Sequence, residues 1–107
     1  MNKGARLLAI LGITFVLAAA TGLAQPSGEE LYKAKCLNCH GPAGLANSGV
    51  GKLMKVKPVT DPAVRKMSEE EMINTIRLGS GKMQAYKGSL SESEIRTLVF
   101  YFRGFIK

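Results

Sequence analysis

Three observations predict an all-α fold with three main helices and long connecting loops. The signal Ser-x-x-Glu occurs three times, beginning at Ser27, Ser68 and Ser91. In this signal the Ser side chain accepts from an early backbone amide and the Glu reaches back to the Ser amide, so each pair marks a helix start. Sustained alternation of apolar and polar residues, the pattern of a strand, is missing from the sequence. Finally, a long stretch rich in glycine and proline, 41–67, separates the first two helix starts.

We expect the three helices at residues 28–38, 69–78 and 92–105. The last one shows the clearest period, because its apolar residues recur at the spacing of a single helical face, at Ile95, Leu98, Val99, Phe102 and Ile106. Tyr101 and Phe105 widen this apolar face beyond what one surface helix needs. We therefore expect the third helix to be covered on two sides.

The stretch 41–67 is expected to be mostly irregular. One short helical turn is predicted at 62–66, since Pro62 suits the first turn of a helix and Asp61 can cap it. A loop of this length is uncommon in a compact domain unless it serves a function. The sequence thus predicts that the stretch wraps round a ligand.

The first 24 residues have the three parts of a secretory signal peptide. Lys3 and Arg6 give a positive start, an apolar run follows over 7–20, and Gly22 and Ala24 are small residues before a cut at Gln25. An uncleaved anchor is the alternative, but the apolar run is shorter than the ~20 residues that span a bilayer. We predict an exported protein, in the periplasm or an equivalent compartment, with one mature domain over 25–107.

The charge of the chain is basic. The full sequence carries 15 Lys and Arg against eight Asp and Glu, and removing 1–24 takes away two cations, which leaves 83 residues with a charge of +5. A basic surface favours an acidic partner. Nucleic acid is not expected, because no basic run is interleaved with aromatic residues. A chain this short usually needs a cofactor or another cross-link to complete its core.

The chemistry of the chain is concentrated in Cys36-Leu37-Asn38-Cys39-His40, a C-x-x-C-H motif typical of covalent haem attachment. The two thiols can add to the two vinyl groups of one porphyrin, and the next residue presents its imidazole to the iron. A thioredoxin-like pair would need a βαβ pattern, and a structural zinc site would need a fourth ligand. A disulfide across so short a loop would stabilise little. The motif therefore predicts one haem c bound through Cys36 and Cys39, with His40 as an iron ligand.

The iron either leaves its sixth position open or takes a ligand there from a methionine or a lysine, because the sequence has no second histidine. Met72 lies on the apolar side of a predicted helix and is expected in the core, while Met67 precedes a helix cap and can pack as a hydrophobic staple. Met54, in the wrapping stretch, is the second choice. Met83 is favoured because its loop, 79–88, is rich in glycine and can approach a flat ring closely. Methionine with histidine is a common axial pair of haem.

Taken together, these residues resemble the class I c-type cytochromes, and most closely the small mono-haem members from bacteria, cyanobacteria and algae. Gly28 and Tyr32 resemble the small and aromatic residues of the family's first helix, and Leu98 and Tyr101 resemble their partners on its last helix. The segment 81–86 resembles the methionine loop. Gln84 departs from the family, which most often has proline after the methionine.

The resemblance implies a small cytochrome c fold, with three main helices and long loops wrapped round one covalent haem. It also implies a soluble one-electron carrier with His40 and Met83 as axial ligands, monomeric and not an enzyme. Its partners would be acidic-surfaced redox proteins that meet a basic rim at Lys35, Lys82 and Lys87, and it would reach a membrane only through a membrane-bound partner or an uncleaved signal. Two alternatives stay open: an open-site haem protein, such as a peroxidase-like enzyme or a gas sensor, and a subunit fixed to one partner complex.

Overall fold

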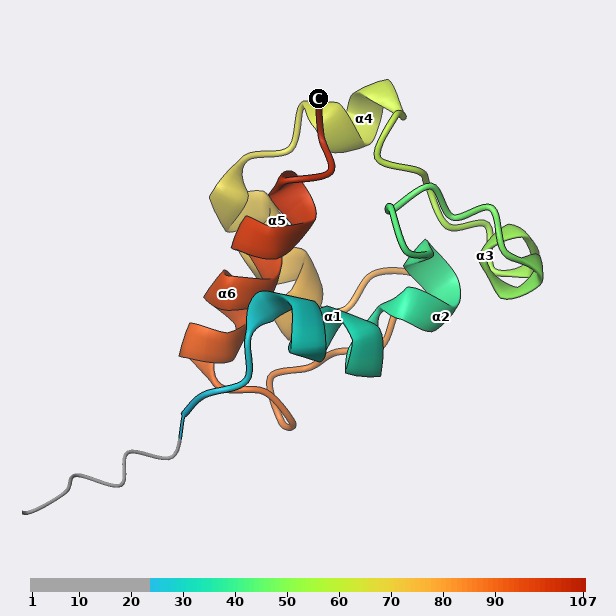
Figure 1. Ribbon diagram of the computed structural model, residues 1–107. Helices are drawn as coiled ribbons and strands as arrows, with labels where there is room; N and C mark the ends of the chain where they lie inside the picture. Colours follow the sequence, from blue (N-terminus) through green and yellow to red (C-terminus); the bar gives the residue numbers. More distant parts are fainter. Residues whose placement is uncertain (1–23) are drawn as a thin grey trace, which may run out of the picture.

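The computed structural model describes residues 24–107, so the predicted signal peptide lies outside the described residues except for Ala24. The described chain has no strand, only an isolated bridge between Ser80 and Met83. Six helices follow one another along it (Figure 1): α1 (Gly28–Lys35), α2 (Leu37–His40), α3 (Gly49–Leu53), α4 (Pro62–Arg65), α5 (Glu69–Leu78) and α6 (Glu92–Arg103). The prediction of an all-α fold is confirmed.

The predicted capping signals all form. Ser27, Ser68 and Ser91 each accept a hydrogen bond from the backbone N–H of the Glu three residues later, and each Glu side chain accepts one from the backbone N–H of its Ser. α5 has its predicted bounds, and α6 ends two residues earlier than predicted, with Gly104 as its C-cap. The helix predicted over 28–38 is instead two helices, because the backbone departs from helical geometry at Cys36 and a new turn begins there.

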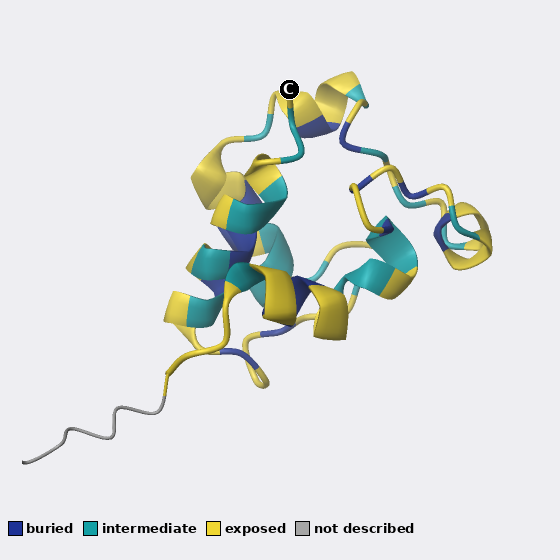
Figure 2. Cartoon of the chain, in the orientation of Figure 1, coloured by how far each residue is buried: buried dark blue, intermediate teal, exposed yellow. Residues whose placement is uncertain are grey.

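The core lies where α6 packs against both α1 and α5, as the wide apolar face of α6 predicted. Figure 2 shows buried segments on each of these three helices. The largest fully buried side chains come from all three helices: Tyr32, Ile73, Ile95, Leu98 and Val99. This packing fixes the end of α1, from which α2 continues.

The contact between α1 and α6 is close at Gly28. A Cβ at Gly28 would lie 2.8 Å from Cβ of Tyr101 and 3.0 Å from the carbonyl oxygen of Thr97, so only glycine fits there without a shift. One turn later, the ring of Tyr32 lies 5.3 Å from that of Tyr101, measured between centroids. The expected pairing of the first and last helices is confirmed.

The stretch expected to be irregular contains α3 as well as the predicted turn, α4. Ser48 caps α3 by accepting from the Gly51 N–H at 3.0 Å, and Asp61 caps α4 by accepting from the Ala63 N–H at 2.8 Å. Among the described helices α3 contacts only α2, and Figure 1 shows it far from α5 and α6. We call residues 45–60 the lobe. A hydrogen bond of 2.9 Å from the Val59 N–H to the Gly44 carbonyl closes its base.

The turn that ends α3 has a lysine where the backbone favours glycine. The Lys55 N–H donates to the Lys52 carbonyl at 3.1 Å and the Val56 N–H to the Gly51 carbonyl at 3.0 Å, which is the Schellman pattern of a helix C-terminus. Lys55 occupies its left-handed position, with φ of 53°. A side chain with a Cβ costs about 1 kcal/mol in this conformation relative to glycine.

Candidate functional site

The junction between α1 and α2 places the three residues of the C-x-x-C-H motif on one turn. The Cys36 N–H donates to the Tyr32 carbonyl at 2.8 Å, and the Cys36 carbonyl accepts from the His40 N–H at 2.9 Å. Cys36 and Cys39 are both half-buried with free thiols. The well-packed end of α1 therefore holds two thiols and an imidazole within a single helical turn.

Burial keeps the Cys36 thiol and the His40 imidazole neutral near pH 7. Burial, with a smaller contribution from Cys39, raises the pKa of the Cys36 thiol to about 11. Burial also lowers the pKa of the His40 imidazole from 6.5. Neutral imidazole is the form that coordinates a metal, so the site suits a large apolar cofactor with a central metal.

The His40 ring is held edge-on against Phe102, with 5.6 Å between the ring centroids. Its Nδ1 atom is buried and has no hydrogen-bond partner in the described part of the chain. A buried ring nitrogen without a partner is unusual in a folded protein, and coordination is one way to satisfy an imidazole. The residues present thus fit an iron-bound ring.

The alternatives to haem find no support in this geometry. Within residues 24–107, no three His, Cys, Asp or Glu side chains are grouped so that they could hold a metal ion, so Cys36, Cys39 and His40 form no zinc site. The described elements also lack the βαβ unit of a thioredoxin-like protein. What the motif offers is two thiols for attachment and one imidazole.

The methionine loop is a tight hairpin between α5 and α6. Ser80 and Met83 exchange backbone hydrogen bonds of 3.1 and 2.9 Å. Gly79 has φ of 76°, and a Cβ there would lie 2.6 Å from the Met83 carbonyl oxygen, so a side chain at residue 79 would push the loop open. The backbone of Met83 is therefore fixed locally by the hairpin and by Gly79.

Tyr86 ties this loop to the haem motif, a role that sequence reasoning missed. Its hydroxyl donates to the Lys35 carbonyl at 3.1 Å, and its backbone N–H donates to the Ile76 carbonyl at 2.9 Å. Lys35 directly precedes Cys36, so Tyr86 spans from the methionine loop to the attachment turn. The one sequence signal for this role was that Tyr86 is the only aromatic residue in the loop 79–88.

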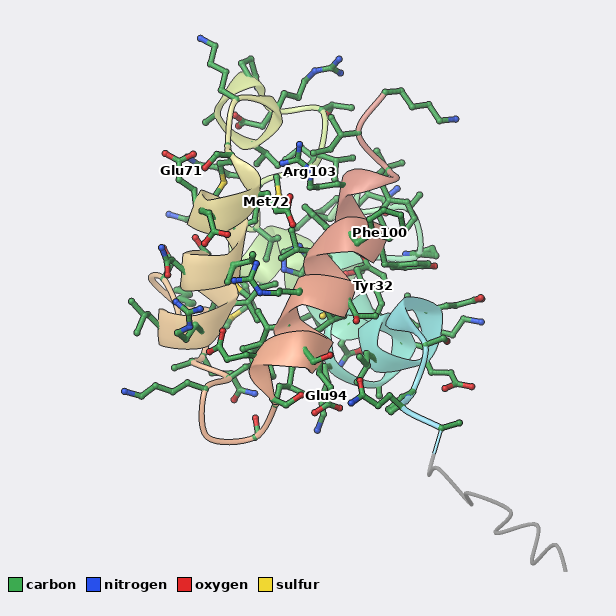
Figure 3. All side chains as sticks on the ribbon, turned by 90° about the vertical axis from the view of Figure 1, so that its left-hand side faces the viewer. Tyr32, Glu71, Met72, Glu94, Phe100 and Arg103 are labelled. Carbon is green, nitrogen blue, oxygen red and sulfur yellow. The ribbon has the colours of Figure 1, made fainter. Side chains whose placement is uncertain are left out.

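The four candidate methionines differ in their surroundings. Met72 is 4% exposed and lies between α5 and α6 (Figure 3), in the core as predicted. Met67 packs partly against the same core, next to the Ser68 cap. Met54 ends α3 and is half-buried outside that core, whereas Met83 is half-buried against it.

The expected basic rim consists of exposed side chains. Lys35, Lys82 and Lys87 are all exposed and make no ion pair among residues 24–107. Their role as a rim stays a prediction. In the same part of the chain, no helix is both long and apolar enough to cross a membrane.

Comparison with known proteins decides the family. Residues 24–102 match the family described as "Cytochrome C oxidase, cbb3-type, subunit III". The chain is also 31% identical over 75 residues to cytochrome c6 of Leptolyngbya boryana, an alignment that covers 70% of this chain and 85% of the relative. The chain belongs to the class I c-type cytochromes.

Solved structures agree with this assignment. The cytochrome is similar to the KustC0563 c-type cytochrome, with a TM-score of 0.70 and 31% identity over 77% of this chain and 100% of that one. It is also similar to cytochrome c6 from the diatom Phaeodactylum tricornutum, with a TM-score of 0.59 and 25% identity over 74% of this chain and 90% of the other. These similarities confirm the small cytochrome c fold.

Membership of the family settles the cofactor. The cytochrome carries covalently bound haem c, and its C-x-x-C-H motif contains the only two cysteines of the sequence, Cys36 and Cys39. It is a haem electron carrier.

Proposed function

We propose that the cytochrome is a soluble one-electron carrier whose iron is bound by His40 and Met83. The observation that carries this proposal is the fixed methionine loop. Gly79 and the Ser80–Met83 bridge set the backbone of Met83, and Tyr86 ties the loop to Lys35, the residue before Cys36. The Met83 thioether is therefore available as an iron ligand on a loop that is tied to the turn carrying His40.

Each residue of the site has a separate task in this proposal. The bound haem iron supplies the one-electron couple, and a thioether ligand raises its potential. Cys36 and Cys39 attach the ring through two thioether bonds. His40 stays neutral because burial lowers its pKa, and Phe102 packs edge-on against its ring. Since helix packing and hairpin bonds fix both ligands, the site needs little rearrangement when the charge on iron changes.

We propose that the cytochrome is not an enzyme. An open-site haem enzyme needs a free sixth position and a distal acid or base, and the only histidine of the sequence belongs to the attachment motif. Met83, on its fixed loop, would close the sixth position instead.

The second candidate function is an electron-carrying subunit fixed to one partner complex. The family description, which names subunit III of a cbb3-type oxidase, favours it. We propose the free carrier as the main function, exported after cleavage of residues 1–24, monomeric and served by acidic redox partners. The mass and the native size of the exported protein distinguish a cleaved monomer from an anchored or complexed subunit.

The proposed ligands are tested with Met83→Ala and Met54→Ala in the haem-loaded protein. We expect Met83→Ala to lose the iron–sulfur charge-transfer band and to lower the reduction potential, since water or a deprotonated lysine would replace sulfur. Met54→Ala, the matched control from the lobe, should keep both. Loss of the band in Met54→Ala alone would assign the ligand to the lobe. An unchanged spectrum in both variants would exclude Met83 and Met54 as ligands, and a parent protein that shows no iron–sulfur band would favour the open-site alternative.

A further inference from the structure

The charges of the chain are strongly segregated around the haem motif. Residues 31–60 contain five lysines and not one acidic residue. The acids lie in the first turns of α1, α5 and α6 and at the start of α4: Glu29, Glu30, Asp61, Glu69, Glu70, Glu71, Glu92 and Glu94. The segment that carries the haem and the lobe is therefore uniformly positive.

Three of these lysines belong to the lobe, one on α3, one in the turn after it and one two residues further on. Lys52, Lys55 and Lys57 are exposed and form no ion pair with any acid of the chain, all eight of which lie in the described residues. The lobe also exposes apolar side chains of α3, since Leu53 is 75% exposed and Val50 is 43% exposed. The lobe thus combines exposed apolar side chains with positive charge.

The backbone adds a second, independent observation. Lys55 holds the left-handed position that ends α3, where glycine would be more stable. No ion pair of its side chain offsets this cost, because the side chain is exposed and makes no ion pair in the described chain. Residues held in unfavourable backbone conformations are typical of functional sites. This one places an exposed cation directly after α3.

We propose that the lobe is the surface on which an acidic redox protein docks, with Leu53 and Val50 in apolar contact and Lys52, Lys55 and Lys57 facing carboxylates. The proposal rests on the proposed function, for which it names the docking surface. α3 packs only on α2, which carries Cys39 and His40, so a partner seated on the lobe lies beside the attachment turn. Complementary charge of this kind steers encounter and orients the partner.

The basic rim predicted from the sequence, at Lys35, Lys82 and Lys87, is the competing surface. Both sets contain three exposed lysines without ion pairs in the described chain, so neutralising either set changes the net charge equally. The triple variant Lys52→Gln, Lys55→Gln, Lys57→Gln can therefore be compared directly with Lys35→Gln, Lys82→Gln, Lys87→Gln. Any effect of total charge cancels in that comparison.

The haem-loaded variants are measured on a gold electrode coated with a mixed monolayer of carboxylate- and methyl-terminated thiols, at low salt. We expect the lobe triple to lower the rate of adsorption by roughly tenfold or more, in line with the size of electrostatic steering. The rim triple should lower this rate clearly less. Equal or stronger weakening by the rim triple would overturn the proposal.

Two single changes separate docking from folding. Lys55→Gly should raise the urea midpoint of unfolding, because it removes the strained Cβ, and should still weaken adsorption; unchanged adsorption would argue against docking through Lys55. Leu53→Ser should weaken adsorption more than Phe100→Ser, since Phe100 is 83% exposed on α6, which does not contact α3. If Leu53→Ser and Phe100→Ser weaken adsorption equally, Leu53 makes no specific apolar contact with the docked surface.

The same electrode separates failure of docking from failure of the carrier function. The lobe variants should keep the covalent haem, the iron–sulfur band and the reduction potential of the parent protein. A parent protein that gives no reversible one-electron wave would contradict the proposed function itself. A normal wave with equal adsorption of the lobe triple and the parent would contradict only the docking surface.

Discussion

The helical core and the lobe are stabilised by different interactions. In the core, large side chains such as Ile73 and Val99 are wholly buried between helices. In the lobe, backbone hydrogen bonds and a close glycine contact hold the chain, while Leu53 points out of the structure at 75% exposure. The core therefore fixes where the haem-bearing turn lies, and the lobe leaves its side chains free for another molecule.

Removing the haem should have the largest effect on stability, and it should abolish the difference in packing between the core and the lobe. In Cys36→Ala with Cys39→Ala the ring has no covalent anchor, and a domain this small has too little core to fold well alone. We expect a largely unfolded product in which core and lobe are cut equally fast by protease. Circular dichroism and limited proteolysis measure this. A cooperative thermal transition in the haem-free variant would show that the three-helix core folds without its cofactor.

A matched pair of glycines tests the two regions at equivalent positions, since Gly28 and Gly49 each begin a helix. Gly28→Ala should destabilise by about 2 kcal/mol, because the new Cβ would meet Tyr101 at 2.8 Å. Gly49→Ala should stabilise by roughly 0.5 kcal/mol, because nothing lies within 4 Å of its Cβ and alanine favours the helix. Urea unfolding of the haem-loaded proteins gives both values. Similar losses at the two positions would mean that the lobe is packed as tightly as the core.

A smaller effect is expected at Tyr32, which links the core to the chain leading into the lobe. Its buried hydroxyl donates to the Gly41 carbonyl at 2.5 Å. Tyr32→Phe should lower the free energy of unfolding by about 1 kcal/mol, the value of one hydrogen bond. The loss stays this small because the Gly41 carbonyl still accepts from the Gly44 N–H. Urea unfolding at neutral pH measures the loss. Unchanged stability would show that the hydroxyl contributes nothing to the link.

The pH dependence gives the same residue a second test. Burial raises the pKa of Tyr32 from 10.0 to about 12. Between these values the folded protein keeps a proton that the unfolded chain has lost, so stability should fall as pH rises from about 10 to about 12. The Tyr32→Phe variant should lose part of this slope. An identical slope in both proteins would assign it to other groups.

Sequence reasoning succeeded where one local signal decides the structure. The Ser-x-x-Glu boxes fixed the starts of α1, α5 and α6, and the apolar period of α6 correctly required cover on two sides. Its failures have a common cause. The break at Cys36 lies inside a helical pattern and depends on how the motif packs, and α3 is too short to show a period, although Ser48 before Gly49 was a usable cap signal.

The candidate site was predictable in part for the same reason. The residues of the C-x-x-C-H motif are adjacent in sequence, so their grouping needed no knowledge of the fold. Tyr86 and Lys35, by contrast, are 51 positions apart, and their hydrogen bond depends on the tertiary arrangement of α1 and the methionine loop. The docking role of the lobe could not be predicted from the sequence, because it depends on the packing of α3 against α2.

The hydrogen bond from the Val59 N–H to the Gly44 carbonyl has a consequence for how such proteins can diversify. It joins the two ends of the lobe at its base, as in compact surface loops that close on themselves. Within the lobe, the Ala46 N–H donates to the His40 carbonyl and the Ser48 hydroxyl donates to the Asn38 carbonyl, so only the residues after Gly51 can be exchanged without disturbing the haem-bearing turn. Exchanging only residues 52–57 would therefore be a way to redirect the cytochrome to a new partner while its redox chemistry is left alone.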